Sequence, residues 1–584
     1  MTGPIDRSAD DAVLARLGKK QVLKRRFDFW SLFGFAVCEL ITWETVLALF
    51  SQGFENGGPS GLLYGFIIAW SSTLSVYTVI SELASMAPIA AGQYYWVYML
   101  SSEKYRVFAS YIIGWLTSLA WIATVATETL FAGTMLEGLV ILDYSTYTAT
   151  NWKGTLLTWA VALVSTFINA VIPSMLPRIE IGTVVFHVAG FIVIIALLWR
   201  YTGSYHNADF VFRTSLNEGN WPTQGLSYCV GFLGNVATFV GADASVHLAE
   251  EVSHAATTIP RVITSSMILN GIVGFVMMIT LLFCLGDVDS VLESQTGFPF
   301  IQIFYNSVRS VAGATVMGAI VLILTWACAT GIITSASRMT WAFARDRGTP
   351  FSRIISKVDP RTQVPIIAIG VVVVIACLLT LINIGSSTAF NDVISLTITG
   401  FYGSYLVPSA LLLYHRLKPG NILPYGSLVD GQDLGTSYPV SAPAASPSDN
   451  DTQPDETYTE KTTKPTESKP GNNAPITVTS ADEQGRITFA PTQLVWGPWH
   501  IPGLLGIINN AYACVYMVFV IFWSVWPPAT PVAADTMNYS VVVTGGVIIL
   551  SIVWYWIRGR KEYKGPLVDK EVIELIQRNQ IVGV

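Results

Sequence analysis

Charged residues are scarce in this chain of 584 residues, since Asp, Glu, Lys and Arg together make up only 12%. An ordinary soluble protein has roughly 25%. Hydrophobic residues make up 52%, more apolar surface than one or two water-soluble domains could bury. This composition excludes soluble enzymes, secreted domains and nucleic-acid-binding proteins, so nucleic acid is not an expected partner.

Cysteine and histidine are also scarce, with six residues of each. The cysteines lie in or beside apolar runs, where cysteine usually packs as a small residue, and the histidines have no ligand spacing. We therefore expect no disulfide framework, no metal and no cofactor. No HxxxH, HxxHH or GxSxG pattern appears, and we do not expect an enzyme. Residues 1–28 are charged and lack the apolar run of a cleavable signal peptide.

Long uncharged runs are what the sequence has instead. Each is near the ~20 residues that a helix needs to cross the ~30 Å apolar layer of a bilayer. We predict an all-α integral membrane protein whose twelve transmembrane helices lie near 29–50, 61–81, 107–127, 155–173, 181–199, 225–242, 266–286, 311–335, 365–385, 388–414, 503–526 and 541–557.

The positions of Lys and Arg predict how the chain is oriented, because these residues gather in cytoplasmic loops. With the N-terminus in the cytosol, twelve crossings place 29 of the 33 Lys and Arg inside, all except Lys153, Arg200, Arg213 and Arg309. Both termini are therefore predicted to be cytosolic. The predicted parts are a tail at 1–28, a ten-helix core at 29–415, a cytosolic loop at 416–500, the last two helices within 501–557 and a tail at 558–584.

The cytosolic loop changes composition abruptly. Residues 426–490 are rich in Ser, Thr, Pro, Asp and Glu and bury too little apolar surface to offset the entropy of ordering, so we predict disorder. The loop is either a regulatory segment or a spacer. Its glycosylation sequon at Asn450 is predicted to face the cytosol, whereas the sequon at Asn538 is predicted to face outside and to carry a glycan.

Two acids in the first span, Glu39 and Glu44, lie where lipid makes charge costly, about 2.5–3.5 kcal/mol at mid-bilayer. On an unbroken helix they point about 140° apart. If the helix unwinds near residues 38–43, both can face one cavity, and irregular backbone is tolerated at that depth only in such a place. The alternative is a protonated Glu bonded to a neighbouring helix.

The sixth span has Gly241 and Asp243 in its middle, followed by His247 one turn on and by Glu250 and Glu251 two turns on. A stripe of titratable groups beside a broken helix suits a proton path or a cation site. The alternative is that His247 only links Asp243 to a neighbouring helix. For Glu251 we also expect a cytosolic gate in which it pairs with Arg338 or Arg345.

Several motifs resemble the fungal amino-acid, GABA and choline permeases of the amino acid–polyamine–organocation superfamily. They are TWE at 42–44 with FENGGPSGLLYG at 54–65, SELASMAPIAAGQYYW at 81–96, GADASVHLAEE at 241–251, SRMTWAFARDRGTPFS at 337–352 and GPW at 497–499. The resemblance extends from residue 29 to about 565. The insertion at 426–490 departs from the short loop of relatives, and Glu39 stands where a small or hydroxylated residue is more common.

The resemblance implies a five-plus-five inverted repeat, with helices one and six discontinuous at the bilayer centre and two peripheral helices after the repeat. Substrate would bind at the two breaks, and it would be an amino acid, GABA, choline or a related small amine. Carried over by motif, the substrate-binding candidates are Thr42, Trp43, Glu44, Phe239, Gly241, Ala242 and Asp243.

The predicted function is a secondary active transporter in a lipid bilayer that imports its substrate with protons. Asp243, His247, Glu251 and Glu39 are the proton-coupling candidates, and His187 is a weaker one. The alternatives are transport or export of a specialised metabolite, a choline or polyamine permease, and a nontransporting nutrient sensor. We expect the plasma membrane, with a vacuolar or other internal membrane as the alternative.

Overall fold

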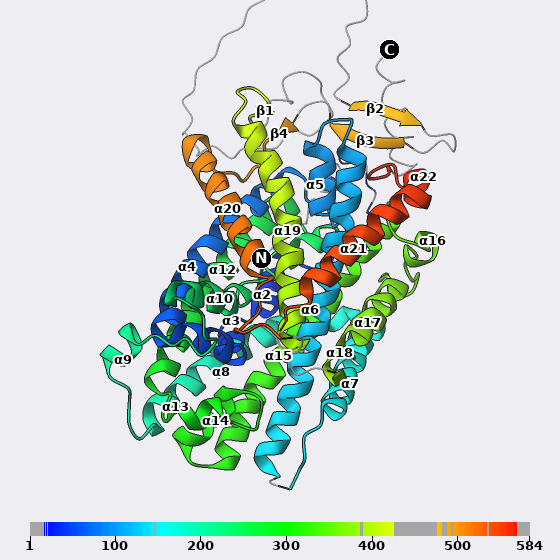
Figure 1. The fold of residues 1–584 in the computed structure, drawn as a ribbon. Helices are drawn as coiled ribbons and strands as arrows, with labels where there is room; N and C mark the ends of the chain where they lie inside the picture. Colours follow the sequence, from blue (N-terminus) through cyan, green and yellow to red (C-terminus); the bar gives the residue numbers. More distant parts are fainter. Residues whose placement is uncertain are drawn as a thin grey trace, which may run out of the picture.

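The computed structural model is a bundle of long helices with two small pairs of strands beyond one end (Figure 1). It describes residues 14, 17, 19, 21–144, 146–385, 389–425, 476–481, 487–491, 494–533 and 537–568. We call the end with α5 (Gln93–Leu100) and the strands the tail end, at the top of Figure 1. The loop end, at the bottom, holds α13 (Val288–Leu292) and α14 (Pro299–Val308).

Most of the bundle consists of helices long enough to cross a bilayer. They are α4 (Phe50–Met86), α6 (Arg106–Asp143), α7 (Asn151–Val171), α8 (Leu176–Tyr201), α12 (Ala255–Phe283), α15 (Val311–Arg345), α17 (Ile366–Thr380) with α18 (Ile382–Gly385), α19 (Ala389–Arg416), α20 (Gly503–Trp523) and α21 (Ser540–Trp554) with its helical continuation to Glu562. The shorter helices are α2 (Phe29–Leu40), α3 (Thr42–Ala48), α9 (Ala208–Arg213), α10 (Gln224–Ala237), α11 (Ala244–His247), α16 (Ser352–Ile355) and α22 (Arg560–Glu562).

With α2 and α3, which together form the segment Phe29–Ala48, eleven described segments are long and apolar enough to span a membrane, one fewer than the sequence predicts. The difference lies in the sixth predicted span. Its helix α10 has only 14 residues and ends at Ala237, before the chain has crossed the bundle. The interruption that the sequence predicts at Gly241 is therefore what removes this segment from the long helices.

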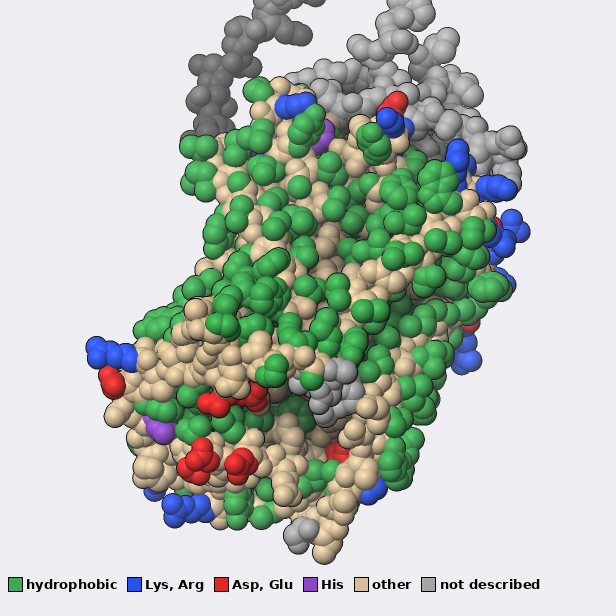
Figure 2. Space-filling model, viewed as in Figure 1, with side chains coloured by type: hydrophobic (Ala, Val, Ile, Leu, Met, Phe, Trp, Pro, Cys, Tyr) green, Lys and Arg blue, Asp and Glu red, His purple; other side chains and the backbone are tan. Residues whose placement is uncertain are grey.

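The outside of the bundle is apolar, as a lipid-facing surface must be. Large side chains such as Leu163, Val185 and Val515 each expose about two thirds of their surface or more. Hydrophobic side chains cover most of the visible face in Figure 2. A soluble protein rarely exposes a contiguous apolar patch of more than a few hundred Å², so this surface requires a bilayer.

The first span is interrupted at Ile41. Helix α2 begins at a capping box in which the Asp28 carboxylate accepts the Ser31 N–H, and it ends when Ile41 adopts φ 29° and ψ 49°. A positive φ is unfavourable for a β-branched residue. Helix α3 resumes at Thr42, so the break lies between the two acids of this span, Glu39 and Glu44.

The sixth span has a longer interruption, between the end of α10 at Ala237 and the start of α11 at Ala244. Gly241 lies in this segment with φ 111°, a conformation that only glycine adopts easily. A carbon added at Gly241 would lie 3.4 Å from the carbonyl oxygen of Glu39. The two interruptions therefore approach each other closely inside the bundle.

The insertion departs in part from the prediction of disorder. Strands β2 (Ile476–Ala481) and β3 (Ile487–Pro491) form an antiparallel pair, and β1 (Ile422–Leu423) pairs in parallel with β4 (Leu494–Val495). The segment ITVTSA begins with four consecutive β-branched residues, a composition that favours a strand. The remainder of the predicted disordered segment, including Asn450, lies outside the described residues.

Candidate functional site

One hydrogen bond joins the two breaks directly, and a second joins the first break to α12. The Thr42 hydroxyl donates to the Thr238 carbonyl at 3.0 Å, and the Thr42 N–H donates to the side-chain oxygen of Asn270 on α12 at 3.3 Å. All three side chains are buried. A helix break inside the bundle leaves backbone groups without helical partners, and these bonds satisfy part of that requirement.

Tyr77 on α4 occupies two more of the freed donors. The N–H groups of Gly241 and Ala242 both donate to its hydroxyl oxygen, at 3.1 and 3.2 Å. Such N–H groups are what a substrate carboxylate would use in a broken-helix site. In this chain a tyrosine hydroxyl already holds them.

Asp243 is the polar centre of the second break. Its carboxylate accepts from the Gln93 amide at 2.7 Å and from the Tyr405 hydroxyl at 2.5 Å. The ring of His247 lies 3.6 Å away through Nε2, while its Nδ1 is 2.9 Å from the Ala90 carbonyl oxygen. Because a carbonyl only accepts, Nδ1 carries a proton, and Nε2 is the atom of this ring that faces Asp243.

Glu44 contacts α8 rather than the residues of the second break described above. Its Oε1 is 2.7 Å from Nδ1 of His187, and both side chains are fully buried. The other ring nitrogen of His187 and the other oxygen of Glu44 have no hydrogen-bond partner among the described residues. This pair can therefore hold a proton and still present free polar atoms.

Three further acids lie around the breaks without a basic partner. Glu39 on α2, Glu128 on α6 and Glu180 on α8 are each more than nine-tenths buried. Within the described residues, both carboxylate oxygens of Glu39 and one of each of the others lack a hydrogen-bond partner. The carboxyl groups of Glu180, Glu128 and Asp243 lie near Glu39.

The two predicted aromatic gates are packed against other rings. The Trp43 ring centroid lies 5.7 Å from that of His187 and 6.2 Å from that of Phe191. Phe239 contacts Phe66 at 4.9 Å between centroids. Both rings are completely buried, so in this conformation no open path to the site passes beside them.

Toward the tail end, every acid of a second cluster is paired with a base. Glu251 accepts from Arg338 at 2.8 Å, and Glu250 accepts from both terminal nitrogens of Arg345 at 2.6 and 2.9 Å. The cluster also draws in the N-terminal segment, because the N–H of Phe27 donates to the Glu251 carbonyl. Burial lowers the pKa of Arg26 in this segment, and the charge of Glu251 opposes that effect.

The same end is held by Asp346, which follows α15. Its carboxylate lies 2.6 Å from Lys19 and accepts from the Tyr94 hydroxyl and from the N–H of Leu567. The contacts join the chain's beginning, middle and end. We call the acids Glu250, Glu251 and Asp346 with their bases the tail lock.

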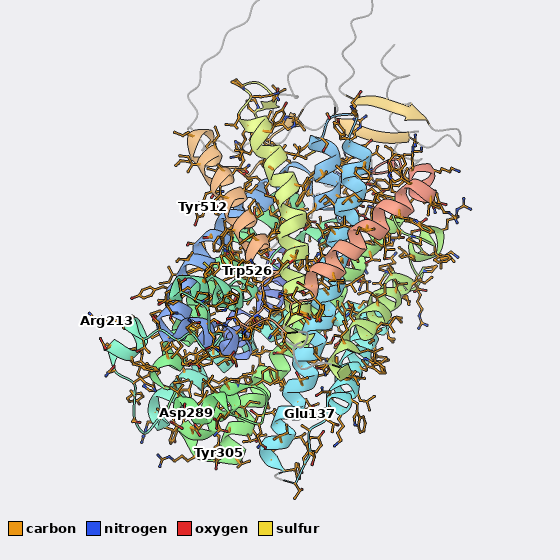
Figure 3. The ribbon with its side chains drawn as sticks, viewed as in Figure 1. Glu137, Arg213, Asp289, Tyr305, Tyr512 and Trp526 are labelled. Atoms are coloured by element: carbon orange, nitrogen blue, oxygen red, sulfur yellow. The ribbon has the colours of Figure 1, made fainter. Side chains whose placement is uncertain are left out.

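A cavity of about 410 Å³ opens instead toward the loop end. Three acids, Glu55, Glu137 and Asp392, line it together with neutral polar residues. Figure 3 labels Glu137 and Trp526, which are both part of its lining. In Figure 2 acidic side chains gather around a hollow in the lower part of the view.

The structure brings together most of the residues that the sequence selects. Thr42, Gly241, Ala242 and Asp243 meet at the breaks, whereas Glu44 and Trp43 turn toward α8 and Arg345 pairs with Glu250.

The predicted glycan on Asn538 conflicts with the structure. This side chain is buried, and its amide donates to Ser395, Ser524 and Trp526.

Five polar residues of the site do not appear among the sequence candidates. They are Tyr77, Gln93, Glu128, Glu180 and Tyr405. For Glu128 and Glu180 a signal existed, because acids inside long apolar helices are functional candidates. The predicted spans end at 127 and begin at 181, and each excludes one of these acids by a single residue.

Comparison with known proteins places the chain among transporters. The amino acid permease family model matches residues 27–441. The chain belongs to the amino acid permease family. This permease is 30% identical over 387 residues to a Macrophomina phaseolina protein named as an amino acid/polyamine transporter. The match covers 66% of this chain and 85% of the relative.

Two yeast proteins match nearly the whole of this permease. The choline transporter of Saccharomyces cerevisiae is 27% identical over 561 residues, and the GABA-specific permease of the same yeast is 26% identical over 570; each match covers 96% of this chain and 86% of the relative. The crystal structure of a mutant of the Eremococcus coleocola manganese transporter matches the fold of this chain with a TM-score of 0.50 at 12% sequence identity. The match covers 95% of this chain and 97% of that one. This permease is a multi-pass membrane transporter.

Proposed function

We propose that this permease moves an amino acid or a related small amine across the membrane by proton symport. The observation that carries the proposal is the meeting of two interrupted helices around buried acids, Glu39 and Asp243, inside the bundle. Irregular backbone and unpaired acids at this depth are costly, and transporters place both at their substrate sites. The names of the choline and GABA relatives support a nitrogenous solute.

The proposed architecture has twelve crossings, with α10 and α11 forming an interrupted sixth, and a five-plus-five inverted repeat from α2 to α19. Both termini face the cytosol, so the tail end is cytoplasmic and the cavity at the loop end faces outside. In this arrangement the structure corresponds to a conformation with the inner side closed. We further propose that the protein resides in the plasma membrane and imports its solute.

The proposed proton carriers are Asp243 with His247, and Glu44 with His187. Both are acid–imidazole pairs fully buried next to a break, and histidine is the side chain that changes charge near neutral pH. Glu39 is a further carrier when no solute is bound. Glu251 is the inner gate rather than a relay in this proposal, because Arg338 already balances its charge.

Uptake in a permease-deficient yeast strain tests the proposal. Cells that express the full chain are given labelled amino acids, GABA, choline and putrescine at external pH 5 and pH 7. We expect saturable uptake of at least one solute, faster at pH 5, with alkalinisation of an unbuffered medium when the solute is added. No saturable uptake of any solute would reject the transport function.

Asp243→Asn is the variant for this experiment. We expect uptake to fall by a factor of about 10 to 100, because hydrogen bonds to a buried charged group contribute about 1.5–3 kcal/mol each. Glu103→Asn is the control, since this side chain is 82% exposed. Unchanged affinity and unchanged pH dependence in Asp243→Asn would show that Asp243 has no part in the site.

A further inference from the structure

Acidic side chains outnumber basic ones around the two breaks. Five buried acids surround them: Glu39, Glu44, Glu128, Glu180 and Asp243. Among the described residues, the ion pairs that these acids form are with imidazoles only, those of His187 and His247. Taking a charge out of water costs several kcal/mol unless a counter-charge is supplied, so the solute or protons must supply it.

The freed backbone groups at the breaks also favour positive charge. Helices α2 and α10, with 12 and 14 residues, both point their C-terminal ends at the site. A helix C-terminus carries a partial negative charge and favours a cation. The helices that start at the breaks, α3 and α11, have only 7 and 4 residues.

The groups that would hold a carboxylate are already engaged. The N–H groups of Gly241 and Ala242 donate to Tyr77, and the N–H of Thr42 donates to Asn270. A zwitterionic solute would have to displace these partners and place its carboxylate among five acids. A solute that has only positive charge meets neither cost.

Four of these acids have carboxylate oxygens without a partner among the described residues, two on Glu39 and one each on Glu44, Glu128 and Glu180. Both Glu39 oxygens and one Glu128 oxygen have no partner among the described residues, although both side chains are more than nine-tenths buried. The Glu39 carboxylate lies against Gly331 of α15, because a carbon added there would be 2.1 Å from its Oε1. The absence of a side chain at Gly331 therefore leaves the space that this carboxylate occupies.

We propose that the solute of this site is an organic cation without a carboxylate, whose ammonium group is held by Glu39 and Glu128. This inference rests on the proposed transport function and narrows its substrate class. The acids that line the cavity at the loop end, Glu55, Glu137 and Asp392, also favour the entry of a positively charged solute. We call this cavity the outer cavity. Quaternary amines and short diamines both belong to this class.

Matched pairs of probes separate a cation from a zwitterion of similar shape. Choline is compared with betaine, in which a carboxylate replaces the alcohol, and putrescine with GABA, in which a carboxylate replaces one amine. Binding to the purified full-length chain is measured by thermal stabilisation and by competition with labelled probe. We expect the cation of at least one pair to bind about tenfold more tightly, or better, than its partner.

Glu39→Gln and Glu128→Gln keep the shape of the side chain and remove its charge. We expect each to weaken binding of the cation by about tenfold or more and to leave binding of the zwitterion nearly unchanged. Without solute, Glu39→Gln should melt at a higher temperature than the native chain, which shows that it folds. Glu103→Gln, at the exposed Glu103, is the matched control.

Three results would overturn the inference. Tighter binding of betaine and GABA than of choline and putrescine would do so, with the transport function intact. An unchanged cation-to-zwitterion ratio in both glutamine variants would show that other groups recognise the charge. Stabilisation by sodium chloride alone that is lost in Glu39→Gln would assign these carboxylates to an inorganic cation.

Discussion

The acids at the helix breaks and the acids of the tail lock are equally buried but differently paired. In the tail lock, Glu251 and Asp346 each have a base within 2.8 Å. At the breaks, Glu39 and Glu128 have no base among the described residues. The same chemical group thus holds the chain together in one place and is left available for a solute in the other.

The tail lock should give the largest effect when it is broken. We expect Arg338→Ala to lower the free energy of unfolding by about 3–5 kcal/mol, because it leaves the buried Glu251 with only a longer contact to Arg26, at 3.9 Å. The melting temperature of the purified protein measures this loss. Glu251→Gln combined with Arg338→Gln should recover part of it, and a double variant no more stable than Arg338→Ala would contradict the pairing.

Tyr77→Phe tests whether the backbone donors at the second break affect the choice of solute. It removes the acceptor of the Gly241 and Ala242 N–H groups, at a cost of about 1–3 kcal/mol for the donors left unpaired. The freed donors are then available to a carboxylate. We therefore expect the preference for putrescine over GABA to shrink in competition binding, and an unchanged preference would show that these donors do not matter.

Glu44 is an intermediate case, since its partner His187 is itself titratable. His187→Gln keeps a hydrogen bond available to Glu44 but cannot bind a proton. We expect the ratio of uptake at external pH 5 to uptake at pH 7 to fall toward 1, with little change in the affinity for the solute. The same ratio as in the native chain would exclude this pair from proton coupling.

An exposed ion pair should give the smallest effect. Asp209 and Arg213 on α9 lie 3.1 Å apart, and their side chains are 70% and 81% exposed. Exposed pairs contribute about 0.2–1 kcal/mol. Asp209→Asn should therefore change neither the melting temperature nor uptake measurably, and a large loss would mean that pairing in this protein does not depend on burial as we describe.

Local cost in the sequence pointed to the breaks without deciding them, and the resemblance to the permeases implied that both helices are discontinuous. Glu39, Glu44 and Asp243 are acids in apolar runs, and Gly241 is a glycine in a helical span. The structure interrupts both spans near these residues. Each of these signals is visible within a single helix and needs no knowledge of which helices are neighbours.

The partners around the breaks could not be predicted in this way. Tyr77, Gln93 and Tyr405 come from α4, α5 and α19, and only the packing of these helices brings them to Asp243 and Gly241. A tyrosine or glutamine in an apolar helix has many uses. The direction of Glu44 toward His187 likewise follows from the turn at Ile41, whose geometry the sequence does not specify.

The position of a bound solute tests the account most directly. A cryo-electron-microscopy map of the purified chain with putrescine should show one ammonium group within about 3 Å of the carboxylates of Glu39 and Glu128, the distance of a charge-assisted hydrogen bond. Solute density elsewhere, such as beside Glu55 and Glu137 in the outer cavity, or a site without solute at a saturating concentration, would contradict it.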